Sequence, residues 1–320
     1  MHILITGGAG FIGSNLCQFL LDKGHIITCI DNLSSGYLSN IKSFHDNFTF
    51  INADIITYNF NQLPSDIEQI YHLSCPASPK SYQSDPIQTA KTNFIGTMNL
   101  LEFIKFRNQN NKDNKDNKNI RILFTSTSEI YGDPLEHPQK ESYWGHCNPI
   151  GIRSCYDEGK RIAETLMFDY QRIHNIDIRV VRIFNTYGPN MDIDDGRVVS
   201  NFICQALQNK DITIYGNGSQ TRSCCYVSDT VQGLYTFMNQ SKITSPCNIG
   251  NPYEITIKDL AYLIMKLIPE STSKIIYQSL PSDDPKIRQP DITKIKEIWI
   301  PKIDLEDGLR LSIKYFEQII

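Results

Sequence analysis

A tyrosine and a lysine four residues apart, Tyr156 and Lys160, form the clearest chemical pattern in the chain. The segment that contains them is predicted to be a helix, and a separation of four places both side chains on one helix face. A phenol with a pKa of about 10 is a poor base at neutral pH, but a neighbouring ammonium cation favours the phenolate. The pair therefore predicts a tyrosine that serves as an acid/base toward a substrate hydroxyl group.

The segment "TSTSEIYG" lies at the end of a predicted strand upstream of this pair. Its Thr127 is expected to hydrogen-bond the reacting hydroxyl group and to orient it toward Tyr156. A YxxxK pattern alone occurs by chance in many helices. Its combination with this strand end and with a glycine-rich turn near the N-terminus indicates a catalytic site.

That turn, "ITGGAGFIG", supplies Gly7, Gly10 and Gly13 between the first predicted strand and the first predicted helix. Glycines in this position permit a tight turn and a close backbone approach to a pyrophosphate, whose charge then sits at the helix N-terminus. Asp31 ends the second strand about 20 residues further on, where a carboxylate accepts hydrogen bonds from ribose hydroxyls and repels a 2′-phosphate. The sequence therefore favours NAD over NADP as the cofactor.

The bulk properties exclude several classes of protein. The chain has 320 residues, 40% of them hydrophobic, and a net charge of −4, so it can bury a sizeable core and carries no basic field for nucleic acid. With no signal peptide and no apolar run of about 18 residues, a soluble cytoplasmic protein is expected, without a membrane partner. The nine cysteines show no CxxC spacing and the histidines no ligand spacing, so reduced thiols and no metal are expected.

Apolar runs that alternate with helix-like stretches must position these residues. Such alternation predicts an α/β fold of Rossmann type, with a doubly wound parallel sheet and right-handed crossovers. Expected strands are "HILIT", "IITCID", "FTFINAD", "QIYHLS", "IRILFTSTS" and "DIRVVRIFN", with helices at 14–23, 89–107 and 155–174.

A smaller C-terminal substrate-binding domain is expected after residue 188, where the pattern becomes irregular before a helix at 257–267. The predicted division is 1–188 for the NAD-binding domain and 189–320 mainly for the substrate. The segment 223–239 could return to the first domain. The polar, low-complexity stretch 108–119 is interpreted as a disordered surface insertion.

Longer segments resemble the UDP-glucuronate decarboxylases, also called UDP-xylose synthases, of the extended short-chain dehydrogenase/reductase family. The resemblance covers nearly the whole chain and is carried by "CPASP", "TSTSEIYGDPLEHPQKESYWGHCNPIGIRSCYDEGKRIAET", "IFNTYGPNMDIDDGRVVSNFI", "YGNGSQTRS" and "DDPKIRQPDI". It implies oxidation of the glucuronosyl ring at C4 with NAD, loss of carbon dioxide from C6, and reduction to UDP-xylose. The cofactor would be regenerated in each cycle.

The resemblance also implies roles for individual residues. Glu129 would lie beside the sugar ring, and Arg288 would face the substrate near its carboxylate or the enolate. Asp54 would meet the adenine, although a solvated aspartate in a turn is the alternative. Further cofactor contacts are expected from Phe11, Ile12, Asn32 and Ile55, and contacts with UDP-glucuronate from Tyr82, Lys91, Asn185, Arg197, Tyr215, Arg222 and Arg288. A homodimer through the helices of Thr89 and Tyr156 is implied as well.

Several related activities remain open at this point. The 4,6-dehydratases carry an acidic pair after the threonine, whereas this chain has Ser128, so the acid for loss of water is missing. Glu129 and Arg288 argue against a 4-epimerase. A relative that decarboxylates the same substrate but releases the 4-keto pentose with NADH is poorly separated by sequence. A sensor that only binds NAD or a UDP-sugar usually lacks the tyrosine or the lysine, and both are present.

Overall fold

The computed structural model describes residues 1–44, 46–110, 119–280 and 287–320. The predicted insertion at 108–119 falls partly outside this range: residues 108–110 end a helix, and 111–118 lie outside the described residues. Part of the "DDPKIRQPDI" segment, residues 283–286, also lies outside it.

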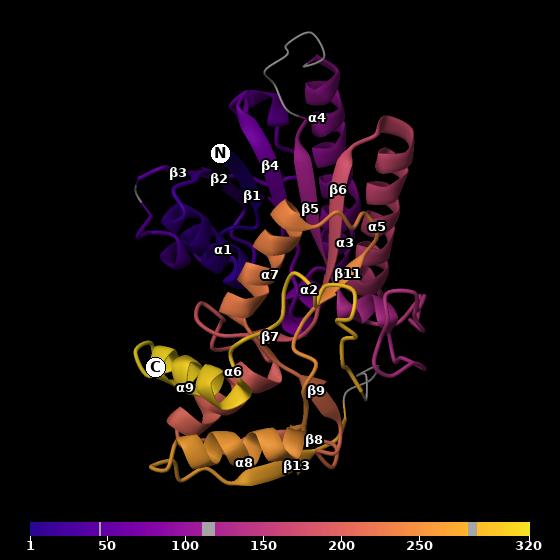
Figure 1. The fold of residues 1–320 in the computed structure, drawn as a ribbon. Coiled ribbons are helices and arrows are strands. Elements are labelled where there is room, and N and C mark those ends of the chain that lie inside the picture. The colour runs from indigo at the N-terminus through magenta and orange to yellow at the C-terminus, as the bar shows by residue number, and fades with distance from the viewer. Residues whose placement is uncertain (45, 111–118, 281–286) are drawn as a thin grey trace.

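A parallel sheet forms the upper part of the molecule in Figure 1, and its strand order is β11-β6-β5-β4-β1-β2-β3. Every pair of neighbouring strands in it is parallel, which confirms the doubly wound Rossmann-type fold. Its strands are β1 (His2–Thr6), β2 (Ile26–Asp31), β3 (Phe48–Asn52), β4 (Ile67–His72), β5 (Arg121–Thr127), β6 (Asp177–Ile183) and β11 (Cys247–Ile249). The last strand was not among the six predicted; it is three residues long and comes from the second half of the chain.

Helices cover both faces of this sheet. The helices are α1 (Phe11–Asp22), α2 (Pro79–Ser84), α3 (Pro86–Lys91), α4 (Thr97–Asn110), α5 (Ser154–His174) and α7 (Val227–Gln240). One face packs Ile3, Ile5 and Leu123 against α1 and α7, and the opposite face packs Leu4 and Phe124 against α4 and α5. Alternate residues of β1 therefore enter opposite cores, as the two-residue period of a strand requires.

The helix expected at 89–107 is interrupted. It begins at Pro86, and residues Thr92–Gly96 form a π-helical turn between α3 and α4. This was not predicted, because hydrophobic spacing does not reveal a π-turn, a feature often found at functional sites. The helix that carries Tyr156 and Lys160 matches its prediction within one residue and ends at Asn175, whose φ of 55° is left-handed.

The remaining elements form the lower part in Figure 1, below the carboxyl edge of the sheet. They are β7 (Thr186–Tyr187), α6 (Val198–Leu207), β8 (Ile212–Tyr215), β9 (Thr221–Ser223), β10 (Cys225–Tyr226), β12 (Glu254–Thr256), α8 (Ile257–Leu267), β13 (Ile275–Gln278) and α9 (Leu305–Phe316). They enclose a core of their own, in which α6, α8 and α9 supply Phe202, Leu260 and Leu309. The predicted helix at 257–267 is confirmed.

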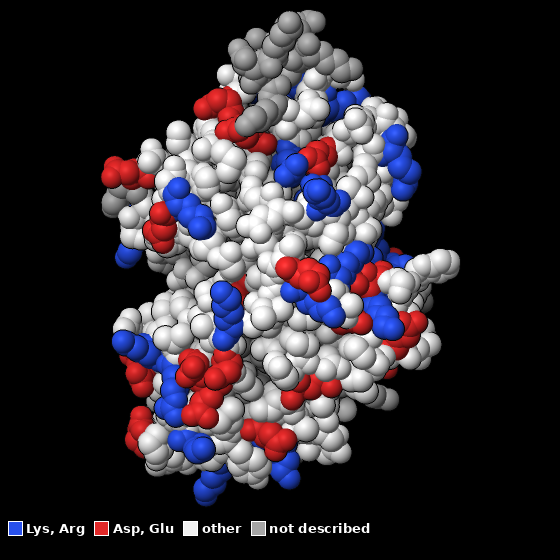
Figure 2. All heavy atoms as spheres, viewed as in Figure 1, with Lys and Arg blue, Asp and Glu red and all other residues white. Residues whose placement is uncertain are grey.

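The segment 223–239 lies mostly within α7, whose Leu234 and Phe237 pack in the core beneath α1. All nine cysteines are free thiols. Within the described residues no helix is both long and apolar enough to cross a membrane, and no group of three metal-ligating side chains occurs. Acidic and basic side chains are intermixed on the face in Figure 2.

Candidate active site

A cavity of about 540 Å³ lies where the carboxyl ends of the central strands meet the lower part of the molecule. This edge is the expected ligand site of an open α/β sheet. Most of the predicted site residues line it: Gly7, Gly10, Phe11, Ile12, Gly13, Asp31, Asn32, Asp54, Ile55, Thr127, Glu129, Tyr156, Lys160, Asn185, Arg197 and Arg288.

The glycine-rich turn at the cavity floor leaves no room for side chains. Gly7 has a φ of +77°, and a Cβ there would lie 2.8 Å from the Leu73 carbonyl carbon. A Cβ on Gly13 would lie 2.0 Å from the Gly7 carbonyl oxygen. The turn therefore brings bare backbone and the start of α1 to the cavity, which suits a pyrophosphate.

Asp31 holds this turn as well as facing the cavity. Its Oδ2 accepts a hydrogen bond from the Ala9 amide at 3.0 Å, and its Oδ1 accepts one from the Leu33 amide at 2.8 Å. Burial raises the pKa of Asp31, while these two backbone donors oppose the rise. Each oxygen keeps a free lone pair, so both can still accept from ribose hydroxyls. The residues thus fit a dinucleotide without a 2′-phosphate.

Tyr156 lies at the far end of the cavity, with its ring stacked on that of Tyr82 at 4.9 Å between centroids. Burial raises the pKa of Tyr156, and a hydrogen bond with Thr127 opposes the rise. The hydroxyl is therefore protonated at neutral pH, and a positive charge brought close to it would favour the phenolate. These contacts suit an acid/base that acts on a ligand beside Thr127.

Lys160 is fixed beneath the tyrosine. Its Nζ donates to the Thr125 carbonyl at 2.8 Å and lies 5.9 Å from the centre of the Tyr156 ring. Burial lowers the pKa of Lys160, while the nearby Cys75 and Glu164 oppose the shift. The lysine has two further N–H donors that a ligand hydroxyl could use.

Glu129 is held between two arginines. Arg288 donates to its two carboxylate oxygens at 2.7 and 2.8 Å, and Arg153 donates to Oε2 at 2.5 Å. Burial alone would raise the pKa of Glu129, but the two guanidinium groups hold it below its usual value. A carboxylate with two cations therefore stands at the cavity wall next to Thr127.

Arg153 and Asp157 were given no role from the sequence, although both lie in the segment around the Tyr156–Lys160 pair. Arg153 is the N-cap residue of α5, Asp157 lies in the first turn of that helix, and both are buried. Burial, reinforced by the Glu129 carboxylate, raises the pKa of Asp157 to about 7, against the opposing effect of Arg153 and Arg288. Its Oδ1 has no hydrogen-bond partner among the described residues. Only the fold could reveal this crowding of acidic groups.

The raised pKa of Asp157 predicts a pH-dependent cost to stability. Because the folded-state pKa of about 7 exceeds the ordinary value of 3.8, the folded protein binds the extra proton, and stability is lost as pH rises through that window. Asp157→Asn should therefore increase the free energy of unfolding by an amount that grows up to about pH 7, where it reaches on the order of 4 kcal/mol. Urea denaturation of both proteins at about pH 5 and pH 8 measures this. An equal difference at both pH values would contradict it.

The predicted substrate residues are only partly brought together. Asn185 and Arg197 line the cavity, where Arg197 makes a bidentate ion pair with Asp195. Buried Asn185 Nδ2 has no partner among the described residues, so a donor is available to a ligand. The cavity lining does not include Tyr82, Lys91, Tyr215 or Arg222. Tyr82 nevertheless touches Tyr156, whereas Lys91 and Tyr215 are exposed and Arg222 donates to the Thr221 carbonyl at 2.9 Å.

Similar proteins share both sequence and fold with this chain. UDP-glucuronic acid decarboxylase 5 of Arabidopsis thaliana is 52% identical over 99% of the chain and 89% of that protein. UDP-glucuronic acid decarboxylase 1 of Danio rerio is 49% identical over 99% of the chain and 73% of that protein. The UDP-glucuronic acid 4-epimerase of Bacillus cereus, solved with UDP-glucuronic acid and NAD, superposes with a TM-score of 0.88 at 29% identity and covers 100% of both chains.

The family can be assigned from these similarities and from the arrangement of the cavity. The glycine turn, Thr127, and the Tyr156–Lys160 pair meet at one edge of the sheet, and a family match runs over residues 4–311. The extent of that match and the identity of about 50% to relatives over 99% of this chain assign the family. This chain belongs to the GDP-mannose 4,6 dehydratase family of extended short-chain dehydrogenases/reductases.

Proposed function

We propose that this chain decarboxylates UDP-glucuronate to UDP-xylose and carbon dioxide with bound NAD. The observation that carries the proposal is the Glu129 carboxylate held by Arg288 and Arg153 next to Thr127 and Tyr156. This arrangement provides an acid/base for one hydroxyl group and a cationic group for a carboxylate in the same cavity. Relatives about half identical over the whole chain carry the name of this activity.

The chemistry follows from what each side chain can do to a glucuronosyl ring. NAD supplies the acceptor and later the donor of one hydride, so the complete cycle is redox-neutral. Thr127 orients the C4 hydroxyl, and Tyr156 takes its proton as C4 becomes a ketone. The C6 carboxylate is then β to a carbonyl; the C5–C6 bond breaks, carbon dioxide leaves, and its electron pair forms an enolate. After C5 takes a proton that enters from solvent, Tyr156 returns its own proton to the C4 oxygen as the alcohol forms, so the net reaction consumes one proton.

The two groups at the cavity wall have separate tasks in this scheme. Arg288 would supply the cation that stabilises the enolate charge as the C5–C6 bond breaks. Glu129 fixes the direction of the Arg288 guanidinium through two hydrogen bonds and would lie beside the sugar ring. Lys160 would hold a ribose hydroxyl of the cofactor and keeps a positive charge near the Tyr156 ring.

The nucleotide part of the substrate needs donors of its own. We assign it to Asn185, Arg197, Tyr215 and Arg222, because a planar guanidinium suits the pyrophosphate. Tyr82 and Lys91 are assigned to the sugar. Residues 1–188 together with 223–239 would then bind NAD, and most of 189–320 would bind UDP. A homodimer through α3, α4 and α5 and a cytoplasmic location complete the proposal.

The activity is tested by incubating the purified protein with UDP-glucuronate. Carbon dioxide, the sugar nucleotide and the absorbance of reduced cofactor are followed together. Equal amounts of carbon dioxide and UDP-xylose are expected, without net reduction of the cofactor. Reduced cofactor equal to carbon dioxide would indicate release of the 4-keto pentose, and a C4 epimer without carbon dioxide would refute decarboxylation.

Asp31 predicts the choice of cofactor. NAD should bind the protein at least about tenfold more tightly than NADP, a difference of about 1.4 kcal/mol, because the 2′-phosphate would face a carboxylate. Asp31→Asn, which keeps an acceptor oxygen for the Ala9 or Leu33 amide, should narrow the difference. Calorimetric titration with both cofactors measures it, with Asp22→Asn, whose carboxylate accepts a hydrogen bond from Gln18 on the surface, as the matched control. Equal affinity of the wild-type protein for NAD and NADP would remove Asp31 from this role.

A further inference from the structure

The catalytic pair Glu129 and Arg288 comes from segments far apart in the chain. Glu129 lies on a short 3₁₀ turn, Ser128–Tyr131, that follows β5. Arg288 lies on an irregular segment between the C-terminal elements, and its guanidinium nevertheless meets both Glu129 oxygens. A loop can hold a bidentate ion pair only if other contacts fix its backbone.

One side chain, that of Asn248 in β11, contacts both segments. Its Oδ1 accepts a hydrogen bond from the Tyr131 hydroxyl at 2.8 Å, on the turn that carries Glu129. Its Nδ2 donates to the Gln139 carbonyl at 3.0 Å and to the Asp291 carbonyl at 3.1 Å, three residues after Arg288. Asn248 is 0% exposed, so these bonds are made without competition from water.

Gln139 completes the attachment of the Arg288 segment. Its backbone amide donates to the Gln289 carbonyl at 2.9 Å, and its Oε1 accepts from the Gln289 amide at 2.8 Å. The Asp291 amide donates to the Gln139 carbonyl at 2.9 Å, the same oxygen that Asn248 binds. The residues directly after Arg288 are therefore fixed to 139 by backbone and side-chain bonds.

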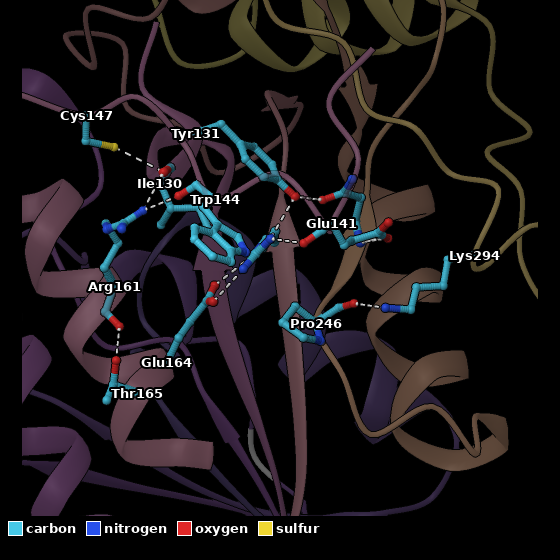
Figure 3. A network of polar contacts seen from close by, with 12 residues as sticks. Ile130, Tyr131, Glu141, Trp144, Cys147, Arg161, Glu164, Thr165, Pro246 and Lys294 are labelled. Carbon is cyan, nitrogen blue, oxygen red and sulfur yellow. Dashed lines mark hydrogen bonds and ion pairs between the residues drawn. The ribbon is translucent and has the colours of Figure 1, made fainter. Parts of the chain in front are cut away.

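Tyr131, which bonds to Asn248, is also linked by hydrogen bonds to α5, the helix of Tyr156 and Lys160. Arg182 in β6 donates to the Tyr131 hydroxyl at 3.0 Å and makes two hydrogen bonds, at 3.0 and 2.8 Å, to Glu164 in α5. Figure 3 shows Tyr131, Glu141 and Glu164 converging on this buried network. Glu164 lies one turn after Lys160, so the network also joins the helix of the acid/base pair.

We propose that Asn248 is a positioning residue for the Glu129–Arg288 pair. One amide group fixes the turn that presents Glu129 and the segment that presents Arg288, and so sets their separation. The inference rests on the proposed function for the step it affects, which is decarboxylation. The groups that act on the C4 hydroxyl, Tyr156 and Thr127, do not contact Asn248 through any hydrogen bond among the described residues.

Two variants of Asn248 test the proposal. Asn248→Ala removes all three side-chain bonds, and the isosteric Asn248→Asp keeps the acceptor for Tyr131 but places an oxygen against two carbonyl oxygens. Both should lower carbon dioxide release by roughly tenfold to hundredfold, since small displacements of aligned groups are costly. Reduced cofactor should still appear after mixing with UDP-glucuronate at a rate within about threefold of wild type. Asn239→Ala, which removes a half-buried amide on α7 bonded to Gln69, is the control and should leave both rates unchanged.

A double-variant cycle separates positioning from general damage. In an Arg288→Ala background, Asn248→Ala should change carbon dioxide release by less than about twofold, because its effect passes through the missing guanidinium. An equal loss in both backgrounds, wild-type rates in both Asn248 variants, or equal losses in oxidation and decarboxylation would each overturn the proposal.

Hydrogen exchange makes the test independent of the activity. The amides of Gln289 and Asp291 should exchange faster in Asn248→Ala and Asn248→Asp than in the wild-type protein, whereas amides in the centre of β1 should not. Unchanged exchange at 289–291 would overturn the positioning role even if the protein decarboxylates UDP-glucuronate. If the amides exchange faster in the variants but the wild-type protein releases no carbon dioxide from UDP-glucuronate, the positioning role holds and the proposed function is refuted.

Discussion

Tyr156→Phe is expected to stop turnover of UDP-glucuronate at its first step. The variant keeps the aromatic ring that stacks on Tyr82 and loses the hydroxyl that Thr127 orients. Removal of a general acid/base typically costs about 10²- to 10⁴-fold in rate, so neither carbon dioxide nor reduced cofactor should form at a measurable rate. Binding of NAD and of UDP-glucuronate should remain close to wild type.

Rapid mixing with UDP-glucuronate, followed by absorbance of the reduced cofactor and by trapped carbon dioxide, measures the loss. Tyr170→Phe is the matched control, since Tyr170 lies on the same helix and its hydroxyl donates to Glu102 outside the cavity. That variant should turn over like the wild-type protein. A Tyr156→Phe protein that oxidises substrate at more than about a tenth of the wild-type rate would assign the proton to another group.

The parts of the site that could be predicted are those set by local geometry. Tyr156 and Lys160 share a helix face, so their spacing alone brings them together. The glycine turn is readable because Gly7 adopts a φ of +77° and Gly13 has no room for a Cβ. The parallel sheet was predicted from strands that alternate with helices. Because Thr127 and Asp31 both end strands of this sheet, both were expected at its carboxyl edge.

The parts that could not be predicted depend on contacts between distant segments. Arg153 bonds to Glu129, 24 residues away, and Asn248 bonds to Tyr131, 117 residues away. Nothing in the sequence around Arg153 or Asn248 indicates these partners. The strand that carries Asn248, β11, has three residues and is too short for a periodic pattern. Asn93 of the unpredicted π-turn forms another such contact, 3.0 Å from its Nδ2 to the Sγ of Cys75, a residue of the cavity lining.

The Glu129–Arg288 pair predicts a separation of oxidation from the later steps. In the proposed reaction, oxidation at C4 uses Tyr156, Thr127, Lys160 and NAD, so Glu129→Ala and Arg288→Ala should impair loss of carbon dioxide more than the first hydride transfer. In at least one of the two variants, reduced cofactor or released keto sugar should persist or increase. Each variant breaks a largely buried ion pair, which commonly costs about 3–5 kcal/mol of stability, so rates must refer to folded protein.

Single-turnover mixing gives both rates in one experiment, with reduced cofactor followed by absorbance and carbon dioxide by trapping. Arg172→Ala on the exposed side of α5 is the control for removal of an arginine, because Arg172 pairs only locally with Asp169 among the described residues. Arg288→Ala should lower carbon dioxide release by about 10²-fold, the usual cost of losing one group that stabilises a developing anion. If both Glu129→Ala and Arg288→Ala bind UDP-glucuronate and NAD but form no reduced cofactor, the pair is needed to position the bound substrate before it is oxidised. Arg288 would then act before the C5–C6 bond breaks, and the division of tasks between α5 and the Glu129–Arg288 pair would be wrong.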